Sequence, residues 1–244
     1  MSKISILFRR EFSSFFATPV AYVFIGIFLI LSSVFTFFVG GFYERGQADL
    51  LPFFNFHPWL YLFLVPAISM RSWSEERKSG TIELLMTLPI STWQAMMAKH
   101  LAAWAVLGLS LLLTFPLWLT VNYLGDPDNG IIVAAYIGSW LMSGAFLSIG
   151  MCMSAMTKNQ VVAFILSVVV CFVFVVSGSN IVLDAFKSWA PSEVIDVVAS
   201  LSFLTHFESM AKGVIALNDL IYFLLVTICW LFAGLIIIEQ KKAD

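Results

Sequence analysis

The sequence predicts an all-α polytopic membrane protein with six transmembrane helices in one domain, residues 1–244. Two observations support this prediction. The 244-residue chain is 60% hydrophobic and only 11% charged, whereas an average soluble domain is about 25% charged. Six apolar stretches also reach the length of about 20 helical residues that crosses a bilayer. They lie near 18–41, 52–72, 99–123, 131–156, 161–184 and 217–239.

Residues 3–16, KISILFRREFSSFF, predict an amphipathic helix that lies along a membrane surface. Its apolar stripe comprises Ile4, Leu7, Phe8, Phe12 and Phe15, while Lys3, Arg10, Ser13 and Ser14 lie elsewhere on the helix. Glu11 falls within the stripe, where an unpaired carboxylate is costly. We therefore expect either a basic or hydrogen-bonding partner from another segment, or a Glu11 side chain that extends to water.

The first span is too long for the core of a signal peptide, and no small-residue cleavage pattern follows it, so we expect it to be retained. Six spans place both termini on the same side. Of the 13 Lys and Arg residues, ten then fall on the side of the N-terminus and three, Arg45, Lys187 and Lys212, on the other. Because basic residues favour the cytoplasmic side, both termini are predicted to be cytoplasmic.

Spans two to four contain residues that shape helices and their packing. Pro58, Pro66 and Pro116 each remove a backbone hydrogen bond and favour a kink. In the fourth span, Gly144, Ser148 and Cys152 recur every four residues and predict a narrow face for close helix packing.

The fifth span ends in SGSN, whose polar residues Ser177, Ser179 and Asn180 either line a substrate path or cap the helix end. About 32 residues then precede the last span. Apolar residues at 194, 195, 197, 198 and 201 predict a short amphipathic helix, and Thr205 with Glu208 has the spacing of a capping box for another. We expect a re-entrant or surface-lying helical pair on the outer face.

The sequence contains no phosphate-binding loop of the Gly-x-x-x-x-Gly-Lys-Ser/Thr type and no hydrolase motif. His57, His100 and His206 lie near span ends or in the outer loop, and no charged residue in the middle of a span indicates an ion relay. We therefore expect no catalytic residue, cofactor or metal in this chain, and no nucleic-acid partner. A transport function would need an external source of energy.

The stretch RSWSEERKSGTIELLMTLPIS, residues 71–91, concentrates charge between spans two and three. The charged EERKSG leaves the membrane, Gly80 permits a turn, residues 81–88 predict a short helix, and Pro89 stops it. Ser91 and Gln94 have capping-box spacing for the next helix. A short helix held between two spans could transmit a push from a soluble motor. Alternatively, the stretch is a solvated loop whose charges only enforce topology.

This stretch, followed by Lys99, resembles the loop of ABC-2 type permeases, the membrane subunits of ABC exporters. Three further segments resemble parts of that family: RREFSSFFATPVAYV its N-terminal elbow helix, SIGMCMSAMTKNQ the end of its fourth span, and LTHFESMAKGVIALNDLIYF the approach to its sixth. The last segment and the overall length are most similar to the gliding-motility-type subgroup.

The resemblance implies a half-transporter in the inner membrane that pairs with a second copy or a related permease. Each permease would contact a cytoplasmic ATPase subunit, which binds ATP and Mg, and an auxiliary protein on the outer face is expected in this subgroup. The implied coupling residues are Glu75, Glu76, Arg77, Lys78, Gly80, Thr81, Glu83 and Leu84, and the implied elbow residues are Arg10 and Glu11. The family's substrates are too diverse for one to be inferred.

Two other functions are compatible with the residues themselves. A channel or membrane scaffold acting without an ATPase would make the charged loop incidental. An intramembrane hydrolase could use the acidic pair Glu75 and Glu76, although no histidine lies near it in the sequence. An ATPase encoded in an adjacent reading frame, and its co-purification, would favour the permease over both.

Overall fold

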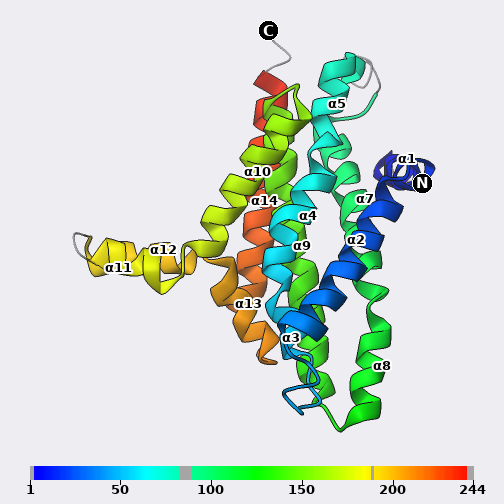
Figure 1. The fold of residues 1–244 in the computed structure, drawn as a ribbon. Helices are drawn as coiled ribbons and strands as arrows, with labels where there is room; N and C mark the ends of the chain where they lie inside the picture. The colour runs from blue at the N-terminus through cyan, green and yellow to red at the C-terminus, as the bar shows by residue number, and fades with distance from the viewer. Residues whose placement is uncertain (1–2, 83–88, 188–189, 241–244) are drawn as a thin grey trace.

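The computed structural model describes residues 3–82, 89–187 and 190–240, and within these ranges it contains helices and no strands. Figure 1 shows long helices packed along a common direction, with α1 lying across their side. The helices are α1 (Lys3–Ala17), α2 (Val20–Val34), the π-helix η1 (Phe35–Val39), α3 (Leu51–Asn55), α4 (His57–Ser69), α5 (Arg71–Ser79), α7 (Thr92–Leu112), α8 (Phe115–Leu124), α9 (Asn129–Met156), α10 (Gln160–Val176), α11 (Asn180–Lys187), α12 (Ser192–Ser200), α13 (Phe203–Ala211) and α14 (Leu217–Gln240).

Helix α9 forms the centre of the bundle. It contacts α4, α5, α7, α10, α13 and α14, and every residue from Met142 to Ala155 is buried. Its N-terminus is capped by Asp128, whose carboxylate accepts hydrogen bonds from the backbone of Gly130 and Ile131. The second half of α9 is buried on all sides and can therefore be apolar around its whole circumference, so its sequence shows little amphipathic pattern.

Small residues on α9 allow neighbouring helices to approach closely, as membrane helix packing requires. A Cβ atom added to Gly150 would lie 1.9 Å from the Ser69 hydroxyl of α4. The predicted close-packing face comprises Gly144, Ser148 and Cys152, and these three residues belong to the buried stretch of α9. Gly144 packs against the Trp104 ring of α7, while Cys152 lies beside Gly234 of α14. The predicted close-packing face is confirmed, but it serves two neighbours rather than one.

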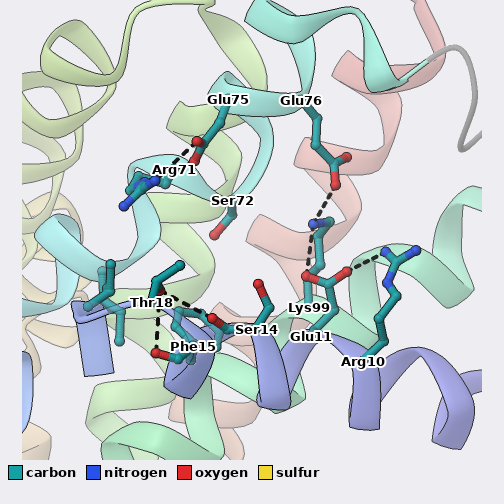
Figure 2. Close-up of a pocket in the computed structure, with 12 residues that line it drawn as sticks. Arg10, Glu11, Ser14, Phe15, Thr18, Arg71, Ser72, Glu75, Glu76 and Lys99 are labelled. Atoms are coloured by element: carbon teal, nitrogen blue, oxygen red, sulfur yellow. Dashed lines mark hydrogen bonds and ion pairs between the residues drawn. The ribbon is translucent and has the colours of Figure 1, made fainter. Parts of the chain in front are cut away.

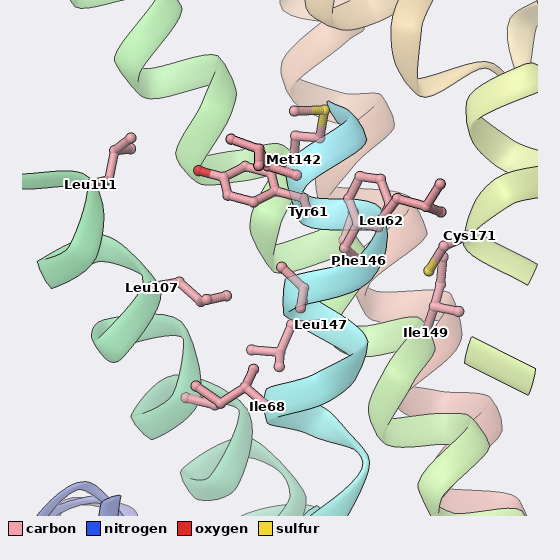
Figure 3. Close-up of a cluster of buried hydrophobic side chains, with 14 of the residues drawn as sticks. Tyr61, Leu62, Ile68, Leu107, Leu111, Met142, Phe146, Leu147, Ile149 and Cys171 are labelled. Carbon is pink, nitrogen blue, oxygen red and sulfur yellow. The ribbon is translucent and has the colours of Figure 1, made fainter. Parts of the chain in front are cut away.

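The core between α4, α7, α9 and α10 is filled by aliphatic and aromatic side chains (Figure 3). Tyr61 of α4 points towards the side of Leu107 and Leu111 of α7, whereas Leu62 lies on the side of Cys171 of α10. The Tyr61 hydroxyl is paired with Ser139 at 2.8 Å, so its polar atom is satisfied inside the bundle.

Among the described residues, four segments are helical, long and apolar enough to cross a membrane: Val20–Val39, Thr92–Leu124, Asn129–Met156 and Leu217–Gln240. They correspond to the first, third, fourth and sixth predicted spans. The pair α12 and α13, bent by 61°, could count as a fifth, broken span or as a re-entrant loop. Six spans therefore stay a prediction.

The other two predicted spans differ from the structure in their boundaries. The segment 52–72 is divided among α3, α4 and α5, with breaks at Phe56 and Met70. The segment 161–184 ends as a helix at Val176, and a turn and α11 follow. The break at Phe56 lies within an apolar stretch, so hydropathy alone does not reveal it. The other two breaks lie where the sequence turns polar, at Arg71 and at Ser177, within the last residues of the predicted spans.

The segment before the last span forms three short helices, of which α11 and α12 extend sideways from the bundle (Figure 1). The predicted amphipathic helix corresponds to α12. The predicted start of the next helix at Thr205 is wrong, because Ser202 is the N-cap of α13 and accepts a hydrogen bond from the Thr205 backbone. Thr205 and Glu208 have capping-box spacing, but they lie three residues too late.

Candidate functional site

The charged stretch that follows α4 begins as a helix, α5, rather than as an irregular exit from the membrane. The break between α4 and α5 is bridged by Ser154 of α9. Its hydroxyl oxygen accepts hydrogen bonds from the backbone of Trp73 and Ser74 at 3.1 and 3.0 Å, and its proton is donated to the Met70 carbonyl. Backbone groups at a helix start lack partners within the helix, so Ser154 fixes the position of α5 on α9.

A second contact ties α5 to the end of α9. The Arg77 guanidinium donates to the Ala155 carbonyl at 2.6 Å, in the last turn of α9, where a cation is favoured by the helix dipole. Helix α5 ends at Gly80, whose φ of +74° lies in the left-handed region. The expected turn at Gly80 is therefore present, and it directs the chain away from α5.

An open cavity of about 540 Å³ lies between α1, the start of α2, the end of α4, α5 and α7. Figure 2 shows side chains from α1 and from α5 facing each other across it. The lining combines three acidic and three basic residues with hydroxyl and apolar groups: Arg10, Glu11, Ser14, Phe15, Thr18, Val20, Ile68, Arg71, Ser72, Glu75, Glu76 and Lys99.

Lys99 of α7 joins three helices at one side of this cavity. Its ammonium group lies 3.1 Å from Glu11 of α1 and 2.7 Å from Glu76 of α5 (Figure 2). The side chain of Lys99 is only 9% exposed, and it also lies over the buried Trp73 ring, 5.4 Å from its centre. The basic partner expected for Glu11 is therefore Lys99, supplemented by Arg10 at 2.5 Å.

The electrostatics of the cavity follow from these pairs. Burial raises the pKa of Glu11, but the charges of Lys99 and Arg10 outweigh burial and hold the pKa below its usual value of 4.5. A bidentate pair between Arg71 and Glu75, with distances of 2.9 and 3.0 Å, lowers the pKa of Glu75. Both carboxylates are therefore negatively charged near neutral pH.

The other predicted coupling residues lie around the end of α5. Lys78 is exposed, and the Thr81 hydroxyl is paired with Ser79 at 2.9 Å. Glu83, Leu84 and most of the predicted helix 81–88 lie outside the described residues. The chain resumes beside α1, because Lys3 donates to the Pro89 carbonyl at 2.5 Å. The predicted capping box of Ser91 and Gln94 is confirmed at the start of α7.

The polar residues predicted to line a pathway lie elsewhere, in the turn between α10 and α11. Ser177 ends α10, and its hydroxyl donates to the Phe174 carbonyl. The Ser179 hydroxyl is buried without a partner among the described residues, and Asn180 begins α11. None of the three lines the cavity, and their role in a pathway stays a prediction.

Sequence analysis missed Ser154 and Trp73 as functional candidates. One buried serine among several in a long helix gives no sequence signal, because its importance depends on the helix break that it faces. Lys99 gave a partial signal, since it is a basic residue near the start of an otherwise apolar span.

Comparison with known proteins identifies the family of the chain. The family model described as ABC-2 family transporter protein matches residues 54–241, which include the charged helix α5, Lys99 and all of α9. The chain belongs to the ABC-2 transporter family. This ABC-2 chain is similar to the protein named inner membrane transport permease YhhJ of Escherichia coli (strain K12), with 30% identity over 145 residues. The protein of the same name from Shigella flexneri matches equally.

These relatives extend well beyond the matched region. The alignment covers 57% of this ABC-2 chain but only 36% of the length of either relative. Family membership makes this chain a membrane-embedded subunit of the ABC-2 permease type.

Proposed function

We propose that this chain is the permease subunit of an ABC exporter and that residues 75–88 couple it to a separate cytoplasmic ATPase. The observation that carries the proposal is that three other helices fix α5 (Arg71–Ser79), whose second half forms the first part of the predicted coupling segment. Ser154 and Ala155 hold α5 to α9, while Lys99 connects it to α7 and α1.

This arrangement suits the transmission of force. A push on residues 80–90 would act on α5 at one end and on α7 at the other, since the segment connects these two helices. Because Lys3 of α1 contacts Pro89, the same push would also act on α1. Because α9 contacts most of the bundle, displacement of α5 would be transmitted to the helices that cross the membrane.

The family resemblance supports the remaining parts of the proposal. The chain pairs with a second copy or a related permease in the inner membrane, with both termini cytoplasmic, and the ATPase binds ATP and Mg. Similarity to the gliding-motility-type subgroup favours an auxiliary protein on the outer face. Ser177, Ser179 and Asn180 are candidates for the substrate path.

Co-purification with an ATPase encoded in an adjacent reading frame tests the proposal. The tagged permease is isolated from membranes and the retained ATPase is quantified, with Glu83→Ala compared with the wild type. Loss of a charge-assisted hydrogen bond, worth about 1.5–3 kcal/mol, should weaken retention roughly tenfold or more. Glu208→Ala is the matched control, because Glu208 is exposed on α13 and its only described ion pair is the i,i+4 pair with Lys212.

The experiment also distinguishes the two other candidate functions. A channel or scaffold would retain no ATPase, and the Glu83 and Glu208 variants would then behave alike. An intramembrane hydrolase would act without ATP and would lose its activity in Glu75→Gln and Glu76→Gln variants. ATP hydrolysis by the permease chain alone would contradict the proposal directly.

A further inference from the structure

His206 lies at the point where α12, α13 and α14 meet. Both nitrogen atoms of its ring face hydrogen-bond acceptors: Nδ1 lies 2.7 Å from the Asp219 carboxylate of α14, and Nε2 lies 2.9 Å from the Ser200 carbonyl at the end of α12. A neutral imidazole carries one N–H group, whereas the imidazolium carries two. Both contacts can therefore be hydrogen bonds only when His206 is protonated.

The surroundings of His206 favour a positive charge on its ring. Asp219 lies in the first turn of α14, where the helix dipole favours a negative charge, and Ser200 ends α12, where the dipole favours a cation. The Tyr222 ring stacks on the imidazole with the two centroids 3.9 Å apart, and an aromatic face attracts a cation. The His206 side chain is 17% exposed, so protons from the solution can reach it.

Few other ionisable groups lie near His206. Helix α13 packs against α3, α9, α10, α12 and α14, and α3, α9 and α10 contain no Asp, Glu, His, Lys or Arg. On α12, Glu193 and Asp196 are exposed. On α14, Asp219 and Tyr222 are the ionisable groups that face His206. A change in the charge of His206 therefore acts mainly on Asp219 of α14 and on the end of α12.

His206, Asp219 and Ser209 are the residue types of a hydrolase triad, but they are not arranged as one. The Ser209 hydroxyl donates to the Asp219 carboxylate and not to His206. The Nε2 atom, which would have to accept the serine proton in a triad, faces the Ser200 carbonyl instead. The cluster therefore holds helices together and does not activate a nucleophile.

Loss of the proton from His206 would remove one of its two contacts. The remaining N–H group would stay on Nδ1, because the Asp219 carboxylate is the stronger acceptor. Nε2 would then present a lone pair to the Ser200 carbonyl at 2.9 Å, where two acceptors repel each other. The Ser200 carbonyl belongs to the last turn of α12 and lacks a partner within that helix, so the end of α12 would turn to water.

Helices α11 and α12, here called the lateral arm, extend sideways from the bundle (Figure 1). No residue of α12 is buried, so a few contacts at its end determine its direction. Besides the contact with His206, the Tyr222 hydroxyl donates to the Leu201 carbonyl at 2.5 Å. The chain bends by 61° between α12 and α13. Release of Ser200 would allow the lateral arm to rotate about this bend.

From these observations we infer that His206 is a proton-dependent clamp for the lateral arm. The imidazolium joins the end of α12 to Asp219 of α14, and the neutral imidazole releases α12. The arm is therefore held at low pH and is released as the pH rises through the range in which histidine loses its charge, between about pH 5 and pH 8. This inference concerns the lateral arm and does not rest on the proposed ATPase coupling.

Distances between two spin labels on the purified full chain test the clamp without any ATPase. Labels at Val197 of α12 and Leu112 of α7, both exposed, report the position of the arm relative to the bundle, once the exposed Cys229 has been replaced by Ser. We expect one narrow distance distribution at about pH 5 and, at about pH 8, a second population about tenfold larger than at the lower pH. Identical distributions at both pH values would overturn the inference.

Variants assign the response to His206. His206→Phe keeps an aromatic ring beside Tyr222 but removes both hydrogen bonds, so its arm should occupy both populations and its distances should not change with pH. Glu208→Gln is the matched control on α13, because it alters an exposed carboxylate paired with Lys212 and should keep the response of the wild type. A response to pH that persists in His206→Phe would contradict the clamp.

Tyr222→Phe provides a second variant, which leaves the ring nitrogens of His206 and their partners in place. It removes the contact with Leu201, which does not depend on the charge of His206. The arm then depends on His206 alone, so the increase of the second population with pH should exceed that of the wild type. An increase no larger than in the wild type would overturn the inference. Since all these measurements use the permease alone, their failure would leave the proposed ATPase coupling untouched.

Discussion

At the scale of single residues, Lys99 shows how a buried charge can define a joint between helices. Its ammonium lies within 3.1 Å of two carboxylates that come from α1 and α5. Removing one partner from a buried ion pair is much more costly than removing one from an exposed pair, because the other charge stays buried and uncompensated. The Lys99 joint is therefore expected to be among the polar contacts on which the fold depends most.

The first prediction is that Lys99→Met destabilises the purified protein by about 3 kcal/mol, because Glu11 and Glu76 lose their shared cation. The two carboxylates are only 16% and 19% exposed, so solvent compensates them poorly. Thermal unfolding in detergent measures the change. Lys212→Met, which removes a 66% exposed lysine paired with Glu208, should change stability by less than about 0.5 kcal/mol. Equal effects of the two substitutions would contradict the buried joint.

The sequence predicted part of this joint. Glu11 stood out because it interrupts the apolar stripe of an amphipathic helix, which makes a partner necessary for physical reasons. The identity of the partner did not follow, since Lys99 is 88 residues away and the pairing depends on how α1 crosses α7. Long-range pairs of this kind depend on tertiary packing, about which local patterns carry little information.

At the scale of elements, the junction of α4 and α5 depends on a side chain of another helix. Ser154 satisfies two backbone N–H groups and one carbonyl at this break. Arg77 then caps the end of α9 in return. The two helices therefore stabilise each other's ends, and α5 has a fixed direction when it reaches Gly80.

The second prediction concerns this junction. Ser154→Ala leaves the Trp73 and Ser74 amides buried without an acceptor and should destabilise the protein by about 2–3 kcal/mol. Ser148→Ala is the matched control on the same helix. Ser148 is equally buried, but its hydroxyl donates only to Ala145 within α9, so its loss should cost less than about 1 kcal/mol. Thermal unfolding of both variants in one detergent measures the difference, and a Ser148→Ala effect as large as that of Ser154→Ala would argue against the bridge.

The third prediction concerns the end of α5. Among the described residues, no atom lies within 4 Å of a Cβ atom added to Gly80, so the obstacle that they present to a side chain is the φ of +74°. Gly80→Ala should therefore cost about 1 kcal/mol. Gly26→Ala is the control, since Gly26 also has open space but lies inside α2. There alanine should stabilise the helix by about 0.5–1 kcal/mol. Shifts of the melting temperature in the same direction would contradict the conformational explanation.

Helix ends with local signals were easier to predict than helix breaks. The Ser91–Gln94 capping box and the turn at Gly80 were visible because each depends on residues within a few positions. The breaks at Phe56 and Met70 were not predicted, because Phe56 lies within an apolar stretch and the charged residues after Met70 were interpreted as the exit from the membrane rather than as a new helix. The junction at Met70 is bridged by Ser154, a residue 84 positions away, which no local pattern reveals.

At the scale of the whole molecule, α1, α5 and the end of α9 gather towards one end of the bundle, whereas α3, α8 and α13 lie towards the other (Figure 1). Most of the basic residues accompany the first group. The helices α1 and α5 carry Lys3, Arg9, Arg10, Arg71, Arg77 and Lys78, Lys158 follows the end of α9, and Lys99 of α7 is paired with both α1 and α5. This distribution gives the molecule two chemically distinct faces, and the basic face is the one expected in the cytoplasm.

The last prediction tests this orientation by labelling single cysteines in intact cells. A membrane-impermeant thiol reagent should label a cysteine at Asp128, at the start of α9, and should not label one at Ser79, at the end of α5.

The native Cys229 is exposed and would react with the reagent, so it is first replaced by Ser or Ala, whereas Cys152 and Cys171 are buried and can stay. Permeabilised cells provide the control, because both introduced cysteines should then react. Position 79 is itself exposed, so absence of labelling in intact cells reports the membrane barrier rather than burial. Labelling at position 79 from outside, with none at position 128, would reverse the orientation and would place the proposed coupling segment where no cytoplasmic ATPase could reach it.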